Sequence, residues 1–298
     1  MAVANTHMGY VGGAKINNVN YFMTSSSLNP NQTVNAPDLV AGSIIRKGWV
    51  YSKVEPGGTI AGSIHENAQS LWPIAFDRTS DYDHLLHTIP VEVHFYKGGG
   101  WKFDNCVLNK LDISATAGEP VNFTADFAAK SNDDHSVPKT DGPSTEVECA
   151  KLMTWDRVSF EVTGVEGLEF LQSVNFSLNN NVEKIYAIRG DGADSDLYPV
   201  DLPCGVREIT GTISAYAQGP IYDFLTQNIG ADSWCDYTAD NASKDIVFQV
   251  GGCDEEAIID LSFEAVFGRP EGSGGTGAAV YSLAFTAVCE PSGETTAS

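Results

Sequence analysis

The stretch VREITGTISAYAQ, residues 206–218, has a counterpart 149 residues earlier, GGTIAGSIHENAQ at residues 57–69. The offset is half the length of the 298-residue chain. The shared residues are Ile60, Gly62, Ile64, Ala68 and Gln69 in the first copy and Ile209, Gly211, Ile213, Ala217 and Gln218 in the second. Five identities among small and β-branched residues do not establish a repeat, so the order of elements around each copy has to decide.

Alternating apolar and polar residues predict antiparallel strands with one buried face. Residues 121–129, 158–162 and 259–267 carry an apolar side chain at every second position, which is the period of a half-buried strand. Residues 279–288, AVYSLAFTAV, are apolar at nearly every position and predict a strand that is covered on both faces.

The two halves predict one order of elements: strand, long polar loop, repeated strand, short helix, strand and hairpin. In the first half these elements cover residues 19–25, 29–58, 59–64, 68–76 with 82–89, 91–96 and 107–130. In the second half they cover residues 171–178, 179–205, 208–216, 219–229, 246–250 and 257–288. This agreement supports an internal duplication more strongly than the five identities do.

The predicted fold is therefore mainly β, with two tandem antiparallel β-sandwich domains that each carry one short flanking helix. The domains are expected at residues 1–130 and 151–298, with a polar, turn-rich linker at 131–150.

Charge and composition exclude several classes of protein. The net charge is −22, with 16 acids and 10 bases in residues 1–149 and 23 acids and 7 bases in residues 150–298. The absence of a Lys/Arg cluster argues against tight nucleic-acid binding. No secretory leader or long apolar run is visible, which predicts a soluble protein without membrane contact. The six cysteines show no C-x-x-C spacing, so free thiols are expected.

No motif makes a positive case for an enzyme, a metal site or a cofactor. His84 and His87 lie near two aspartates but lack a distant partner, and His94 is expected on the exposed face of its strand. The carboxylates of DGADSD, residues 191–196, do not have calcium-loop spacing. Nucleotide-binding and hydrolase fingerprints are absent from the sequence. We therefore expect no catalytic, metal or cofactor-binding residues.

The second half resembles the tail tube proteins of tailed bacteriophages. In that family a strand with a Ser-Leu-Asn phrase leads through a long loop with a Tyr-Pro pair to a G-x-R-E-x-T-G strand and a short helix with aromatic anchors. The matching residues here are Asn179, Asn180, Tyr186, Tyr198, Pro199, Gly205, Arg207, Glu208, Thr210, Gly211, Tyr222 and Phe224. The resemblance covers residues 155–290 well and 15–130 more faintly, since Gly58 and Thr59 stand where Arg207 and Glu208 do.

This resemblance implies a structural virion protein that assembles in the host cytoplasm and functions in the tail. Its rings would stack through the long loops, at 29–58 and 179–205, into a channel for genome ejection. Three two-domain chains would close a ring of six places, with the hairpins at 107–129 and 257–288 lining the lumen or closing the ring. The implied partners are further copies of the chain and the tape measure, tail terminator and distal tail proteins. Double-stranded DNA would pass through an acidic lumen without specific binding.

Two other functions stay open at this point. A carbohydrate-binding or adhesin-type β-sandwich would expose some of the five tryptophans in a groove. An enzyme with an unrecognised carboxylate pair is the third possibility. Self-assembly would separate the tube protein from both.

Overall fold

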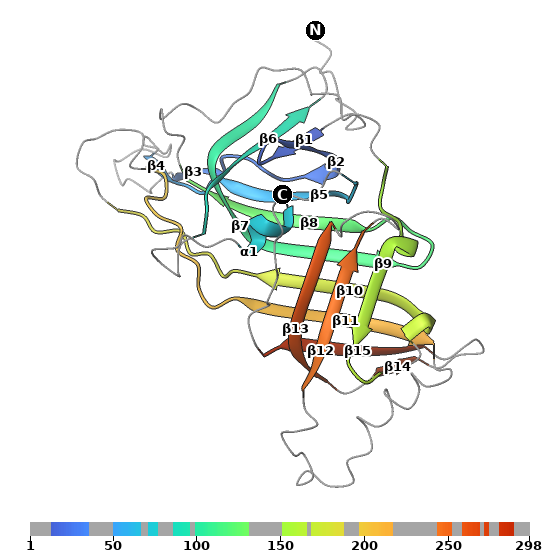
Figure 1. Cartoon of the computed structure of the whole chain (residues 1–298). Coiled ribbons are helices and arrows are strands. Elements are labelled where there is room, and N and C mark those ends of the chain that lie inside the picture. Colours follow the sequence, from blue (N-terminus) through green and yellow to red (C-terminus); the bar gives the residue numbers. More distant parts are fainter. Residues whose placement is uncertain are drawn as a thin grey trace, which may run out of the picture.

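The computed structural model describes residues 13–35, 50–66, 71–76, 86–95, 99–130, 151–165, 168–187, 197–216, 243–251, 258–268, 271–273 and 280–288. Strands dominate these residues, which confirms the predicted mainly β class (Figure 1). The predicted linker, the predicted helix at 219–229, and Ala68, Gln69, Tyr222 and Phe224 lie outside the described residues. No described helix has the length and apolar character that crossing a membrane requires.

The strands predicted for each half are present in the predicted order, whereas the helix predicted for the second half lies outside the described residues. Those of the first half are β1 (Gly13–Ile16), β2 (Val19–Ser26), β3 (Gln32–Asn35), β4 (Val50–Val54), β5 (Gly57–Ser63), α1 (Leu71–Phe76), β6 (Ile89–Phe95), β7 (Gly99–Thr116) and β8 (Asn122–Ala129). Those of the second half are η1 (Trp155–Arg157), β9 (Val158–Val162), η2 (Leu168–Phe170), β10 (Leu171–Asn179), β11 (Glu208–Tyr216), β12 (Ser243–Val250), β13 (Ile259–Phe267), β14 (Glu271–Ser273) and β15 (Val280–Ala287).

All strands except β3 and β4 belong to one 13-stranded antiparallel sheet. In the first half the neighbours run β2, β5, β8, β7, β6, β1, and in the second half they run β10, β11, β15, β13, β12, β9. The repeated strands β5 and β11 occupy the same place in these two series. β1 also pairs with β2, which closes the first series on itself, whereas no pairing of β9 with β10 is present in the described part of the chain.

The long strand β7 joins the two halves. Its 18 residues pair with β6 on one edge up to Cys106. On that same edge residues 110–116 pair with β10, while β8 takes the opposite edge. Because strand pairing crosses the boundary between the halves, the division into two separate sandwiches remains a prediction.

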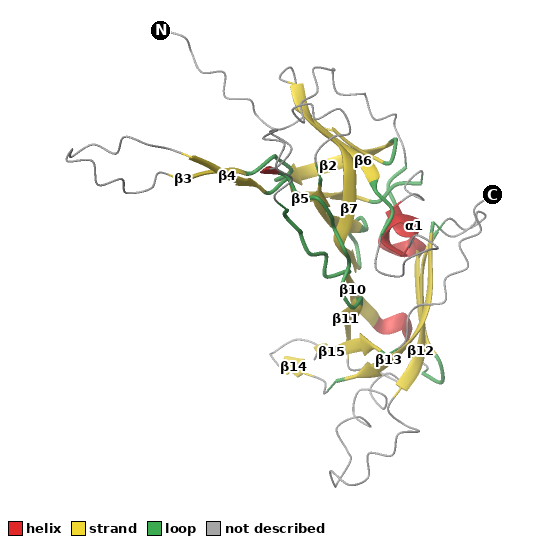
Figure 2. Cartoon of the chain, turned by 90° about the vertical axis from the view of Figure 1, so that its left-hand side faces the viewer, coloured by secondary structure: helices red, strands yellow, loops and turns green. Residues whose placement is uncertain are grey.

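The sheet curls so that its C-terminal strands pack on its middle. β9, β12 and β13 cross over β10, β11 and β15 (Figures 1 and 2), and the Phe176 ring of β10 stacks on Phe248 of β12 with centroids 6.3 Å apart. Phe160 of β9 likewise meets Phe285 of β15. Full burial of each ring contributes about 2–3 kcal/mol, so the apolar face between these layers holds the curl in place.

Both repeated glycines lie against a phenylalanine of the next strand. Gly62 is paired with Phe123 and Gly211 with Phe285. A Cβ at Gly211 would overlap the Phe285 ring and lie 2.5 Å from the carbonyl oxygen of Asn175. A Cβ at Gly62 would come within 3.1 Å of Phe123 Cε1. Glycine is thus needed at both places because backbone and ring approach where a side chain would be.

Two predictions about local structure were wrong. The helix expected over 82–89 is absent at residues 86–88, where Leu86 forms an isolated bridge and β6 begins at Ile89. The expected helix at 68–76 is present over its last six residues, as α1. β15 is not covered on both faces, since Ala284 and Thr286 are exposed. Leu283 and Phe285 point into the core, whereas the alternate residues of the strand face outward, so the apolar run overstated burial.

Gly211→Ala should lower the free energy of unfolding by about 1–3 kcal/mol, because the added methyl overpacks the contact with Phe285. Gly268→Ala is the matched control, since the nearest atom to its Cβ would be 3.5 Å away, and it should change stability by less than about 0.5 kcal/mol. Urea denaturation measures both. Equal stability of the two variants would show that Gly211 is not closely packed.

Candidate functional site

The shared sheet presents one continuous polar face built from both halves. Successive outward residues lie opposite one another from β5 to β15, so the register places polar groups in rows. One row is Ser63, Asn122, Ser114, Asn175, Thr212 and Ala284, and the next is Ala61, Thr124, Asp112, Ser177, Thr210 and Thr286. We call this surface the polar face. The alternate residues on the same strands form the core.

The polar face carries hydroxyl and amide groups with few charges. Side-chain hydrogen bonds run along it, among them Ser63 Oγ to Asn122 Oδ1 at 2.8 Å and the Ser214–Ser282 hydroxyl pair at 3.2 Å. Its charged residues on β5, β8, β10, β11, β15 and residues 110–116 of β7 are Lys110, Asp112, Asp126 and Glu208. One base and three acids give a net charge of −2, so most of the chain's −22 lies elsewhere.

Asn180 locks the two halves together at one end of the polar face. Its side chain is 1% exposed, and its Nδ2 donates to the carbonyl oxygens of Leu108 at 3.0 Å and Ala75 at 3.3 Å. Its Oδ1 accepts from Arg207 Nε at 2.9 Å, and its backbone N–H donates to Asn109 O at 2.8 Å. These bonds link β7, α1 and the start of β11, so Asn180 fixes the register of β10 against β7.

The neighbours of Asn180 form the turn that leaves β10. Asn181 has a positive φ of 49°, a conformation that asparagine tolerates better than most residues. Its Nδ2 donates to Val206 O at 2.7 Å, and Asn179 Oδ1 accepts from the Asn181 backbone N–H at 3.0 Å. The Gly205 N–H donates to the carbonyl oxygens of both Asn180 and Asn181. The motif residues at 179–181 and 205–207 therefore make one hydrogen-bonded cluster.

The two long loops touch where each leaves the sheet. Lys184 Nζ donates to Pro56 O, and Tyr186 OH donates to Val54 O, both at 2.9 Å. Burial lowers the pKa of the Lys184 ammonium and raises the pKa of Tyr186 to about 12, with the nearby Glu55 adding to the effect. Tyr186 is therefore a neutral donor at physiological pH, and it braces the base of the β3–β4 ribbon.

The other described motif residues lie outside the hydrogen-bonded cluster of residues 179–181 and 205–207. Thr210 and Glu208 are exposed on β11, at the polar face, while Pro199 is buried and Tyr198 half-buried in the second long loop. Ile60 and Ile64 are buried in the core, as are their counterparts Ile209 and Ile213.

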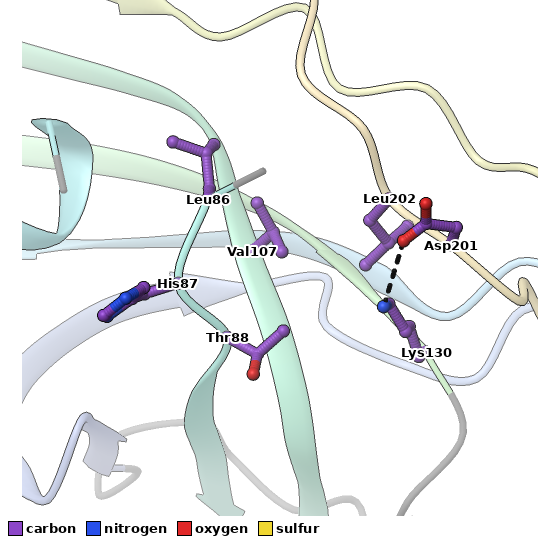
Figure 3. Close-up of a pocket in the computed structure, with 7 residues that line it drawn as sticks. All are labelled: Leu86, His87, Thr88, Val107, Lys130, Asp201 and Leu202. Atoms are coloured by element: carbon purple, nitrogen blue, oxygen red, sulfur yellow. Dashed lines mark hydrogen bonds and ion pairs between the residues drawn. The ribbon is translucent and has the colours of Figure 1, made fainter. Parts of the chain in front are cut away.

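A cavity of about 420 Å³ lies at the seam between the halves (Figure 3). It is lined by Leu86, His87, Thr88, Val107, Lys130, Asp201 and Leu202. Its two opposite charges pair with each other, with Lys130 Nζ 3.2 Å from Asp201 Oδ1. The pair joins the end of β8 to the second long loop, so this seam carries structural contacts.

Two residues behave differently from the sequence-based expectation. His94 was expected on an exposed face but is only 5% exposed, and its Nε2 lies 3.0 Å from Glu92 Oε2 on the same face of β6. Asn109 belongs to no motif and was not singled out from the sequence, yet its Oδ1 accepts from Val182 N–H at 2.9 Å. A polar residue in the apolar-alternating run at 107–115 was the available hint.

Asn180→Leu should lower the free energy of unfolding by about 2–4 kcal/mol. The substitution removes the donor to two buried carbonyls and the acceptor of Arg207, and each unmet group costs about 1–3 kcal/mol. Asn175→Ala, on the exposed polar face, is the control and should cost less than about 0.5 kcal/mol. If urea denaturation gave Asn180→Leu the wild-type midpoint, the network would have no stabilising role.

Comparison with known proteins agrees with this architecture. No curated protein matches the chain. The profile of the phage tail tube protein family matches residues 3–287, which span both halves and the junction between them. Membership in this structural family favours the tube protein over a carbohydrate-binding module or an enzyme. The chain therefore belongs to the phage tail tube protein family and is a structural component of the phage tail.

Proposed function

We propose that three copies of this chain close a ring in which each half fills one of six equivalent places. Such rings would stack into the tube through which the genome leaves the virion. The proposal rests on an internal duplication, for which the shared strand order of the two halves is the support.

The single observation that carries the proposal is the junction between β7 and β10. Seven residue pairs, from Lys110–Asn179 to Thr116–Ser173, join the halves edge to edge. If the two halves are related units, the half of one chain can pair with the half of the next chain in the same way as β7 pairs with β10. A closed ring of such chains leaves no strand edge open. The inner sheet of one chain then runs β2, β5, β8, β7, β10, β11, β15, β13.

The size of the resulting barrel suits a channel. Three chains with eight inner strands each would make a barrel of 24 strands, more than the 16–18 strands that already leave an aqueous pore. With strands about 4.8 Å apart and tilted about 40°, the backbone diameter is roughly 50 Å. This width accommodates duplex DNA after side chains are allowed for.

We assign the polar face to the lumen. The apolar face of the same strands is occupied by the core, so the polar face is the side left for solvent and cargo. With Lys110 hydrogen-bonded to Asp112 at 2.8 Å, this face offers no cation cluster that would hold phosphates. Its modest negative charge would keep DNA moving without strong repulsion.

Ring stacking is assigned to the long loops. The β3–β4 ribbon projects away from the sheet (Figure 2), and Lys184 and Tyr186 of the other long loop support its base. A braced arm of this kind can reach a neighbouring ring. The tape measure protein inside the tube and the terminator and distal tail proteins at its ends would complete the tail, after assembly in the host cytoplasm.

Purified protein should form hollow tubes of stacked rings in negative-stain electron microscopy. The mass per ring, measured by scanning transmission microscopy, should be about 96 kDa, three times the 31.9 kDa chain. Rings with six chains would contradict the duplication, and a monomer that stays monomeric at high concentration would contradict the tube assignment.

Gold labelling tests which face lines the channel. A maleimide-gold particle on Thr212→Cys should appear on the tube axis in cryo-electron microscopy, because Thr212 lies on the polar face. The control is Ser262→Cys, in the part of β13 that pairs with β12 and crosses over the inner strands, and it should place gold outside the tube. Unsubstituted protein, treated in the same way, reports labelling of native thiols. Gold from Thr212→Cys on the outer wall would reverse the assignment.

A further inference from the structure

The junction between β7 and β10 shows how both edges of β10 are paired. β11 pairs with one edge of β10 and β7 with the other. β9, which precedes β10 in the chain, pairs with β12 and, among the described residues, makes no ladder with β10. The edge of β10 is thus left open for β7.

The equivalent edge in the first half is occupied differently. Ser63 and Thr212 are 149 residues apart, as the repeat requires, and their partners are Phe22 and Asn175. Phe22 therefore corresponds to Asn175. On its outer edge Asn175 pairs with Ser114 of β7, whereas Phe22 pairs with Gly13 of β1. β1 lies where a neighbouring unit lies in the second half.

The same comparison of the two halves identifies the strand of a neighbouring copy that would pair with the outer edge of β2. Phe123 pairs with Gly62 and Ile113, and Phe285 pairs with Gly211 and Phe267. Phe267 therefore corresponds to Ile113, the residue that pairs with Phe176 of β10. β12 covers β13 only as far as Val266. From Phe267 through β14 the outer edge carries no other strand among the residues that the structure describes.

We propose that the edge of Phe267 and β14 in one copy pairs with the outer edge of β2 in the next, and that β1 must leave this edge for the ring to close. The register follows from the inner junction: Phe267 lies opposite Met23, and Gly268 opposite Phe22. This inference rests on the proposed ring. The partner is a second copy of the chain, and the contact surface is the outer edge of β2.

The geometry provides a route for the exchange. β2 continues past its pairing with β1, so Met23 to Ser26 have a free outer edge within the described residues. An incoming strand can pair there first and then replace β1 from Gly13 toward the turn at Asn17 and Asn18. β1 keeps its four pairs with β6, as β9 keeps its pairs with β12. Before assembly, β1 protects an edge that would otherwise invite wrong pairing.

A disulfide that ties β1 to β2 tests the exchange. Lys15 and Asn20 are opposite each other, one residue pair beyond the pair that flanks the two-residue turn. This makes them a non-hydrogen-bonded pair, whose Cα atoms are about 4.5 Å apart. That distance is within the range of a disulfide. Oxidised Lys15→Cys/Asn20→Cys should form at least tenfold less sedimentable tube than the reduced protein, and reductant should restore assembly. The control, Ser159→Cys/Gln249→Cys, ties β9 to β12 and should assemble in both states.

A cross-link between copies tests the register. Oxidised tubes of Phe22→Cys/Gly268→Cys should run as covalent trimers on a denaturing gel without reductant, and either single variant should not. Gly268 has room for the new side chain. If the locked protein assembled as well when oxidised as when reduced, or the trimers were absent from intact tubes, the exchange would be wrong while the tube function stood. If wild-type protein formed no tubes, the proposed function would fail first.

Discussion

Seven residue pairs between β7 and β10 carry the sheet from one half of the chain into the other, and the polar face depends on their register. Side chains alternate across a strand, so a slip of one residue would turn the hydroxyl groups into the core and the phenylalanines toward solvent. Asn180 opposes such a slip, because its bonds to Leu108 and Asn109 can form in one register only.

The polar face that crosses the junction of β7 and β10 carries little of the chain's negative charge. A charge of −22 suggested an acidic lumen, but the rows that cross β7 and β10 consist mainly of serine, threonine and asparagine. Neutral hydroxyl and amide groups pair across strands without the like-charge repulsion that a dense acidic face would create. The net negative charge of the whole chain favours solubility and resists non-specific association.

The proposed equivalence of the halves rests on strand order more than on sequence identity. Both repeated glycines pack against a phenylalanine, and both series of six strands share an order. Yet the first series closes through the pairing of β1 with β2, and no such closing pair of β9 with β10 is present among the residues that the structure describes. Identical ends would let a chain pair with any edge it met, so a difference between the edges gives the assembly a direction.

Local pattern determined the strands and their antiparallel pairing within hairpins, because alternation and turn residues act over a few positions. The family phrase also contains Asn180 and Arg207, which the structure joins by a hydrogen bond. Tertiary structure decided the rest. The role of Asn180 depends on carbonyls 72 and 105 residues away, and His94 is buried although the alternation in its strand predicts an exposed position. Burial of a given face is set by which strands pack together, and no local period encodes that choice.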